Sequence, residues 1–186
     1  PIKRLDICPT SIGSASCILA SEEFAKRVCP KPAWIKGTAC IAEPDHFIGR
    51  DIVAMETLGE CAKRAYKQAG ITQPRKEFDV VEIYDAFSFQ EMLWSEGIFL
   101  FDKGTAWRAV EAGVTEMTGE LPINPSGGVL STNNGSDAAM LRILESALQV
   151  TGKAGEHQIE GAKAACAMSW GGRTQFFNVT VVSSEL

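Results

Sequence analysis

The chain has 186 residues, a net charge of −5, 45% hydrophobic residues and 22% charged residues. A chain of this length and composition can bury a sizeable apolar core, so one compact domain is the expected organisation. The negative charge and the lack of a basic cluster argue against nucleic acid or an anionic membrane surface as a partner, and no apolar run approaches the ~20 residues of a membrane span.

The first elements in chain order are a strand, a helix and a second strand. Residues 13–20 are small and apolar, which predicts a strand, and Ser21 with two following glutamates predicts the start of a short helix that ends near Val28. Residues 33–42 read as the next strand, with Gly37 as a possible bulge. Apolar residues at helical spacing then predict a helix within residues 50–69, which Gly70 ends.

The second half alternates in the same way. Residues 78–84 predict a buried strand that leads into a helix over residues 87–98, and a shorter helix is expected over residues 107–112. A further helix carries Leu141, Leu144 and Leu148 on one face and ends before Gly152. Two closing strands, residues 163–169 and 174–182, are joined by a Gly-Gly hairpin turn.

This order, β-α-β-α-β-α-α-β-β, indicates a single α/β domain over residues 1–186. We expect a mostly parallel sheet with helices on both faces and one antiparallel strand from the final hairpin. Ligands of such folds bind where strands end and helices begin. Two segments have that position: the one that starts at Tyr84, and the loop from Asn124 to Asn134.

The loop from Asn124 onwards contains adjacent glycines, which let backbone amides approach a bound group. Ser136 or Asp137 can then cap the next helix, whose first N–H groups face the loop. This arrangement favours a developing negative charge. For an isolated Gly-Gly pair, a simple turn before a helix is the more common explanation.

Six cysteines are scattered without a C-x-x-C pair, and His46 and His157 are the only histidines, so we expect no metal site and mostly buried thiols. Lys3 and Arg4 precede no apolar signal region, which favours the cytoplasm. The chain starts at Pro1 on core-like sequence. We therefore expect that a further part of the protein precedes it.

Four motifs, in order, resemble the C-terminal domain of the thiolase superfamily, and especially sterol-carrier-protein-type thiolases and lipid-transfer proteins. Residues 11–15 (S-I-G-S-A) resemble the family segment S-D-G-A-A, and residues 82–87 (E-I-Y-D-A-F) resemble E-x-H-D-C-F or N-E-A-F. Residues 124–128 (N-P-S-G-G) match the N-x-x-G-G loop, and the fourth motif is the glycine pair at 171–172.

The resemblance implies one half of a two-half protein, with a five-stranded mixed sheet between helices in each half. It places the nucleophilic cysteine in the absent N-terminal half, and it implies an acyl-CoA substrate, with coenzyme A as part of that substrate and no other cofactor. It also implies a homodimer, and an accessory subunit with a zinc ribbon and an OB-type barrel is a family-based possibility. The reaction would form or break a carbon–carbon bond next to a thioester, which needs an oxyanion hole and an acid or base.

The chain departs from the family at Asn134, where alignment of the glycine loop places the histidine of the family motif G-H-P. An asparagine amide can donate a hydrogen bond to an oxyanion but cannot exchange a proton near neutral pH. Tyr84 stands where the family has His or Asn, and a phenol can donate to an oxyanion or, with a lowered pKa, take a proton. Related steroid side-chain aldolases also carry Tyr-Asp-x-Phe at this position. The resemblance therefore makes retro-aldol cleavage an alternative to thiolytic cleavage. The alternative is that Tyr84 is a core aromatic.

Cys166 lies near the second catalytic cysteine of the family, although a buried structural thiol is the favoured interpretation. Asp85 is interpreted as a helix cap that also orients the loop. The candidate catalytic residues are Tyr84, Asn134 and Cys166, and the candidate substrate-binding residues are Asp85, Asn124, Ser126, Gly127 and Gly128. A second hypothesis is a non-catalytic lipid carrier or scaffold subunit, in which the loop serves folding and dimer packing.

Overall fold

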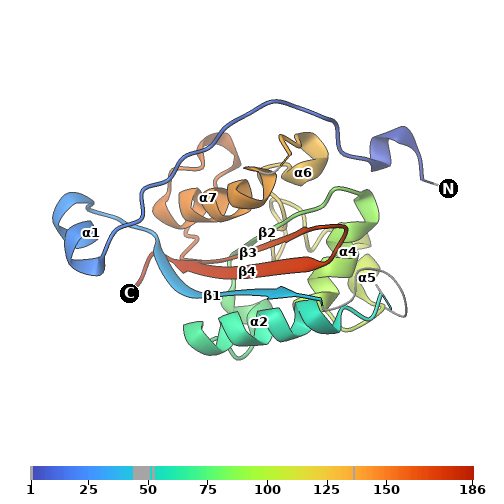
Figure 1. Ribbon diagram of the computed structural model, residues 1–186, viewed down its shortest axis with the longest axis horizontal. Coiled ribbons are helices and arrows are strands. Elements are labelled where there is room, and N and C mark those ends of the chain that lie inside the picture. Colours follow the sequence, from blue (N-terminus) through green and yellow to red (C-terminus); the bar gives the residue numbers. More distant parts are fainter. Residues whose placement is uncertain (1, 44–50, 52, 136) are drawn as a thin grey trace.

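A computed structural model describes residues 2–43, 51, 53–135 and 137–186. The strands of the described residues form a four-stranded sheet in the order β1-β4-β3-β2. The strands are β1 (Trp34–Ala42), β2 (Val80–Ile83), β3 (Ala164–Gly171) and β4 (Phe176–Ser183). Figure 1 shows the sheet between helix α2 (Glu56–Ala69) on one face and helix α7 (Asp137–Thr151) on the other. The expected α/β class with helices on both faces is confirmed.

The sheet is mixed rather than mostly parallel. Only β2 and β3 pair in parallel, whereas β4 pairs antiparallel with both β1 and β3. The strands β1 and β2, which are joined through α2, are not neighbours, because β4 and β3 lie between them. Among the described residues the sheet has four strands, and not the expected five.

The expected strand at residues 13–20 is absent from the sheet. This segment is irregular and mostly exposed, with the side chains of Ile18 and Leu19 in solvent. Figure 1 shows it crossing the outside of the molecule on the α7 side. Strand-forming residues adopt a strand only when a neighbouring backbone supplies the ladder hydrogen bonds. The backbone of residues 122–124, and not that of residues 13–20, makes ladder hydrogen bonds with β2. Val81 N donates to Pro122 O at 3.0 Å, and Asn124 N donates to Val81 O at 2.8 Å.

Most helices lie where the sequence predicts them, with two differences. Helix α2 begins at Glu56 and not near residue 50, and α7 buries the face with Ala138, Arg142 and Ser146, not the predicted face with Leu141, Leu144 and Leu148. Ser21 caps α1 (Glu22–Val28) by accepting a hydrogen bond from Phe24 N at 3.4 Å. Gly70 ends α2 in the left-handed conformation, with φ of +76°. The helices α4 (Ser88–Gly97) and α5 (Ala106–Glu111) are also as expected. The structure adds the short helices α3 (Pro74–Glu77), α6 (Gly128–Ser131), η1 (Arg4–Asp6) and η2 (Gly155–His157).

Two predictions about single residues concern backbone geometry. The β1–β4 register shifts between Ile35 and Gly37, which confirms the bulge at Gly37. A Cβ atom there would collide with the carbonyl oxygen of Ala65, so the missing side chain also lets α2 pack closely on β1. His46 and Ser136 lie outside the described residues.

The sheet separates two apolar clusters. On the α2 side, Val81 and Ile83 of β2 pack with Cys166 and Met168 of β3. On the α7 side, Val80 packs with four buried neighbours: Val150, Ala162, Ala165 and Val182. Because side chains alternate along a strand, Glu82 and Tyr84 point to the α7 side with Val80. The site described below therefore lies between the sheet and the α6–α7 region.

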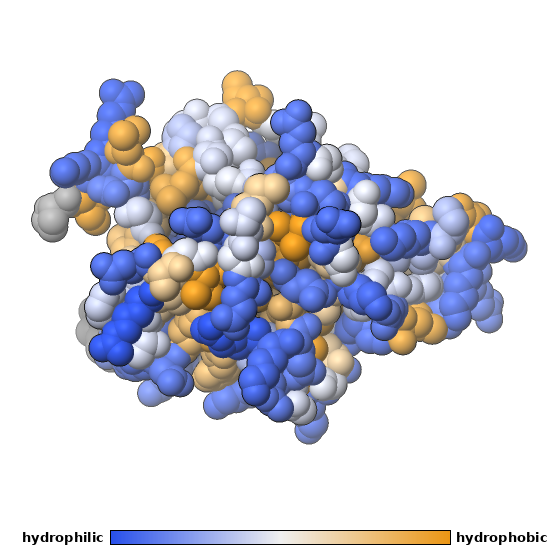
Figure 2. Space-filling view, turned by 180° about the vertical axis from the view of Figure 1, so that it is seen from behind, coloured by the Kyte–Doolittle hydropathy of each residue, from blue (hydrophilic) through white to orange (hydrophobic). Residues whose placement is uncertain are grey.

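Much of the surface is polar. Figure 2 shows hydrophilic side chains interspersed with smaller apolar areas on the face turned away from the view of Figure 1. Within the described residues, no helix combines the length and the hydropathy needed to cross a bilayer.

Candidate functional site

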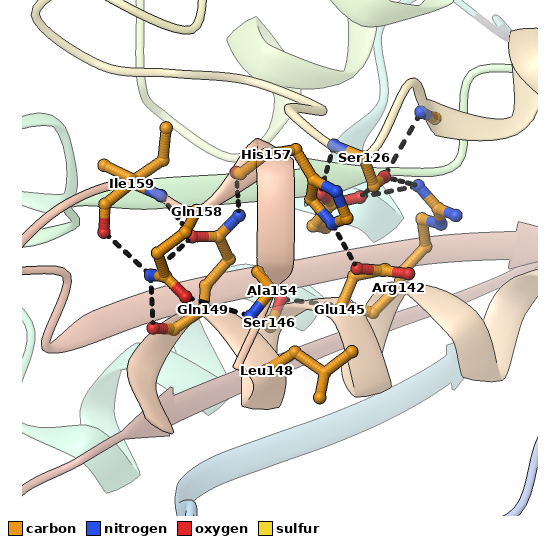
Figure 3. Close-up of polar contacts among 12 residues, drawn as sticks. Ser126, Arg142, Glu145, Ser146, Leu148, Gln149, Ala154, His157, Gln158 and Ile159 are labelled. Carbon is orange, nitrogen blue, oxygen red and sulfur yellow. Dashed lines mark hydrogen bonds and ion pairs between the residues drawn. The ribbon is translucent and has the colours of Figure 1, made fainter. Parts of the chain in front are cut away.

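A buried ion pair lies at the base of the site. Glu82 on β2 and Arg142 on α7 are both almost inaccessible to solvent, and Nη1 of Arg142 lies 2.6 Å from Oε2 of Glu82. The Ser126 hydroxyl donates to the same carboxylate at 2.7 Å and accepts from Arg142 Nη1 at 3.0 Å. Burial raises the pKa of Glu82 to about 7, although Arg142 and Ser126 oppose this shift. Figure 3 shows the Arg142 guanidinium pointing toward Ser126.

The glycine loop is held by the protein's own acceptors. Ser126 N donates to Glu82 at 3.3 Å, Gly127 N to the Asn124 carbonyl at 2.8 Å, and Gly128 N to the Ser126 hydroxyl at 3.3 Å. The next amide, Val129 N, donates to the Asp85 carboxylate at 2.6 Å. The anions that this loop binds in the structure are therefore two internal carboxylates.

Asp85 fits beneath the loop because Gly128 has no side chain. Gly128 has φ of +61°, and a Cβ atom on it would collide with the Asp85 carboxylate and with the Asn124 amide. Burial raises the pKa of Asp85, and the hydrogen bond from Val129 opposes this. Asp85 thus caps α6, which is distant in sequence, and orients the loop. It is not the N-cap of the helix that follows it, α4, where Phe87 has that position.

Asn124 ties the glycine loop to β2. Its backbone is left-handed, with φ of +53°, and its Oδ1 accepts a hydrogen bond from Ile83 N at 2.6 Å. Its Nδ2 atom is close enough to Asp85 to lower the pKa of that carboxyl, but it is buried without a hydrogen bond of normal geometry among the described residues. The Asn124 side chain therefore replaces a strand neighbour for β2.

Tyr84 stands at the carboxyl end of β2 and is about half-buried. Its carbonyl accepts a hydrogen bond from Trp170 Nε1 at 2.8 Å, and the two rings meet edge-on with centroids 5.3 Å apart. Its hydroxyl faces Asn133 Oδ1 at 3.5 Å. Burial, followed by the neighbouring Cys8, raises the pKa of Tyr84 above its ordinary value. The phenol therefore stays protonated at neutral pH and can act as a hydrogen-bond donor, but not as a base with a lowered pKa.

Asn133, which the sequence interpretation did not single out, is the amide that meets this phenol. Its Oδ1 also accepts from Gly135 N at 3.0 Å, and its Nδ2 donates to the sulfur of Cys8 at 3.1 Å. The predicted residue, Asn134, has its side chain beside Gly13, and its Oδ1 is buried without a partner among the described residues. Among the residues that the structure describes, no hydrogen bond joins Asn134 to Tyr84. The adjacent asparagines were a visible signal, but their sequence does not show which one turns toward the phenol.

Cys166 lies on the other face of the sheet from Tyr84. It pairs with Val81 in the β2–β3 ladder and shares the α2 side with it, where its sulfur is 3.8 Å from the Tyr66 hydroxyl. Burial raises the pKa of the Cys166 thiol to about 12. This position agrees with the interpretation of Cys166 as a buried structural thiol and separates it from the phenol site.

The prediction that most thiols are buried is wrong. Two cysteines are buried, and the rest are partly or fully exposed, namely Cys8, Cys17, Cys29 and Cys40.

A second polar network holds the far end of α7. Gln149 is completely buried; its Oε1 accepts from Ile159 N at 2.8 Å and its Nε2 donates to His157 O at 2.7 Å. His157 pairs with Glu145 at 3.0 Å. Figure 3 shows this network on the same helix as Arg142. It fixes the chain that leads into β3, and none of the predicted site residues belongs to it.

Two surface cavities lie elsewhere. One, of about 590 Å³, is lined by residues that include Lys31, Gln149 and Lys163. The other, of about 490 Å³, is lined by residues that include Lys63, Tyr66 and Phe99. Over the described part of the chain, no three His, Cys, Asp or Glu side chains are grouped as metal ligands would be.

Comparison with known proteins agrees with this architecture. Residues 42–184 match the family described as "Thiolase C-terminal domain-like". The chain is 33% identical to an acetyl-CoA acetyltransferase of Methanothermobacter thermautotrophicus, over 92% of the chain and 45% of that protein. It is 34% identical to sterol carrier protein 2 of Bos taurus, over 87% of the chain and 31% of that protein. The chain thus spans less than half the length of these curated relatives.

Two solved structures share the fold. A structure titled "Ltp2-ChsH2(DUF35) aldolase" has a TM-score of 0.74 at 22% identity, over 86% of this chain and 42% of the other. A monomeric SCP2-thiolase-like protein of Mycobacterium smegmatis has a TM-score of 0.59 at 18% identity, over 88% and 32%. On the family match over residues 42–184, with which the fold agrees, this chain belongs to the thiolase C-terminal domain-like family.

Proposed function

We propose that this chain is the C-terminal half of a thiolase-like enzyme that forms or cleaves a carbon–carbon bond next to a CoA thioester. The observation that carries the proposal is the protonated Tyr84 phenol, which faces an asparagine amide at the carboxyl end of β2. This is the edge of an α/β sheet where ligands bind. Family membership and the acetyltransferase and sterol-carrier names of the relatives support the same reaction class.

The chemistry requires stabilisation of an enolate oxygen. A phenol that keeps its proton at neutral pH can donate to that oxygen, and the amide of Asn134 would provide a second donor. The glycine loop would act indirectly in this scheme, because its amides are bound to Asp85 and Glu82. The acyl-accepting cysteine would come from the N-terminal half, CoA would enter as part of the substrate, and no other cofactor would take part. We expect a homodimer in the cytoplasm.

A retro-aldol reaction on a β-hydroxyacyl-CoA is the second candidate. In that reaction the β-hydroxyl loses its proton, the Cα–Cβ bond breaks, and its electrons move into the thioester enolate, which a proton then quenches. The products are a carbonyl compound and a shorter acyl-CoA, and no nucleophilic cysteine is needed. Asn134 in place of a histidine favours this candidate. An accessory subunit with a zinc ribbon and an OB-type barrel would accompany such an enzyme.

The experiment is to express this chain together with its N-terminal half and to follow two reactions. Thiolysis of a 3-ketoacyl-CoA consumes free CoA, whereas retro-aldol cleavage of a 3-hydroxyacyl-CoA proceeds without it. The variant Tyr84→Phe should lower kcat by roughly 100-fold or more if the phenol stabilises the transition state. Tyr66→Phe is the matched control, because its hydroxyl is buried on the α2 side and bonds to Ile98 O.

The outcomes separate the candidates. Cleavage that depends on CoA and on Tyr84 supports the thiolase reaction, and cleavage without CoA that depends on Tyr84 supports the aldolase. If wild type and Tyr84→Phe are equally inactive while a fluorescent acyl lipid still binds, the protein is a carrier or scaffold and the proposal is wrong.

A further inference from the structure

Residues 6–11, which we call the N-terminal strap, connect the two loops of the site. Cys8 N donates to the Ala86 carbonyl at 2.9 Å, in the loop that follows Tyr84. Three residues later, Ser11 N donates to the Asn133 carbonyl at 2.9 Å, in the loop that follows α6. The strap is therefore fixed by its backbone at both loops. Figure 1 shows this segment passing over the α6–α7 side of the sheet.

Side chains strengthen both attachments. The Ser88 hydroxyl donates to Asp6 Oδ1 at 3.0 Å at one end, and the hydroxyls of Ser11 and Thr132 are 2.7 Å apart at the other. Between these points the partly buried Cys8 side chain points to the site. Its sulfur accepts a hydrogen bond from Asn133 Nδ2 at 3.1 Å.

Two contacts set which end of the Asn133 amide meets Tyr84: the Cys8 sulfur accepts from Nδ2, and Gly135 N donates to Oδ1 at 3.0 Å. An asparagine side chain has an accepting carbonyl end and a donating amino end, and a half-turn exchanges them. With the amino end on the Cys8 sulfur, the carbonyl end faces the Tyr84 hydroxyl at 3.5 Å. The phenol then acts as the donor. In the reverse orientation the amino group would donate to the phenol oxygen instead.

We propose that Cys8 is a positioning residue, whose sulfur acts together with the Gly135 N–H to orient the Asn133 amide so that its carbonyl oxygen faces the Tyr84 hydroxyl. Its relevance to catalysis rests on the proposed function, but the orientation itself does not. At 3.5 Å the hydrogen bond from the Tyr84 hydroxyl to Asn133 Oδ1 is weak. The Tyr84 proton can therefore be redirected to a substrate oxygen that arrives beside the phenol.

The test uses the two tyrosines of the chain, each labelled with carbon-13 at Cζ, so that NMR gives one signal for Tyr84 and one for Tyr66. The variant Cys8→Ser keeps an acceptor, Cys8→Ala removes it, and both remove the thiol. The charged or titratable groups that influence Tyr84 are Cys8 and Arg142, so the Ser–Ala comparison isolates the acceptor. Cys17→Ala, at an exposed cysteine beyond the strap, is the control.

We expect the Tyr84 pKa to be lower in Cys8→Ala than in Cys8→Ser, because a freed amino group can donate to the phenolate and stabilise it. In the assembled enzyme, kcat should be roughly fivefold lower in Cys8→Ala than in Cys8→Ser, the ratio typical of one neutral hydrogen bond, with little change in KM. Cys17→Ala should match wild type in both measurements.

Identical Tyr84 titrations in the two Cys8 variants would overturn the proposal. The buried Tyr66 signal reports whether each variant is folded. A measurement on the unaltered chain covers the case of a variant that unfolds: nuclear Overhauser contacts should place the Asn133 side-chain amide protons nearer to the Cys8 β-protons than to the Tyr84 ring, and the reverse order would again overturn the proposal. If the Ser–Ala difference is present but the assembled protein is inactive, the positioning role stands and the proposed function fails.

Discussion

Arg142 and Glu82 form an ion pair 2.6 Å long in which neither side chain reaches solvent. The pair is also the support of the glycine loop, because Ser126 bonds to both partners. A buried charge is tolerated only when its partner and its hydrogen bonds remain in place. The stability of the domain and the shape of the site are therefore linked through these two residues.

Glu82→Gln should lower the free energy of unfolding by about 3–5 kcal/mol at pH 8, because it leaves the Arg142 charge buried without a counter-charge. Urea unfolding followed by circular dichroism measures this. Glu60→Gln is the control, since Glu60 forms an exposed pair with Arg64 whose loss should cost about 0–1 kcal/mol. Equal losses in the two variants would contradict the assignment.

Gly128→Ala should lower the free energy of unfolding by about 2–5 kcal/mol, the combined cost of a left-handed backbone and of overpacking. The added methyl group would displace Asp85, which lies directly beneath. Gly135→Ala isolates the backbone cost, because Gly135 has φ of +75° and open space around its Cβ position, and it should lose only about 1–2 kcal/mol. Thermal and urea unfolding of both variants measure the difference. The packing argument is wrong if Gly135→Ala loses as much.

Glu91 should make stability depend on pH. Burial raises its pKa from 4.5 to about 7, so the folded state binds the proton more tightly than the unfolded state. Its contribution is fully present below pH 4.5 and is lost as the pH rises through 7, by at most roughly 3 kcal/mol. Glu91→Gln should flatten the stability profile between pH 5 and 8, whereas the exposed Glu56→Gln should not. Parallel profiles for wild type and Glu91→Gln would refute the assignment.

Two thiols should be unreactive in the folded chain. Cys61 and Cys166 are buried, with pKa values raised by burial to about 11 and about 12, so they offer almost no thiolate at pH 8. Timed alkylation followed by peptide mass spectrometry should label the exposed Cys17 and Cys40 first. Cys61 and Cys166 should react only in denaturant. Rapid labelling of Cys166 in the native chain would reopen the question of its role in catalysis.

Local patterns in the sequence were sufficient for most elements. The apolar spacing before Gly70 predicts α2, and the glycine pair at 171–172 predicts the hairpin between β3 and β4, because helix periodicity and turn chemistry depend on near neighbours. The family motifs also pointed to Tyr84 and to the glycine loop. These features are short-range, so the order of residues determines them.

Tertiary structure decided what depends on partners distant in sequence. Residues 13–20 have strand-like composition but no neighbouring strand, so they remain outside the sheet. The glycine-loop amides bind carboxylates contributed by Glu82 and Asp85, about 40 residues earlier, and Asn133, which faces the phenol, contacts Cys8 of the strap. The β2–β3 register places Cys166 on the opposite face. Each of these outcomes depends on which groups satisfy buried donors and acceptors across the fold, a choice that local sequence does not encode.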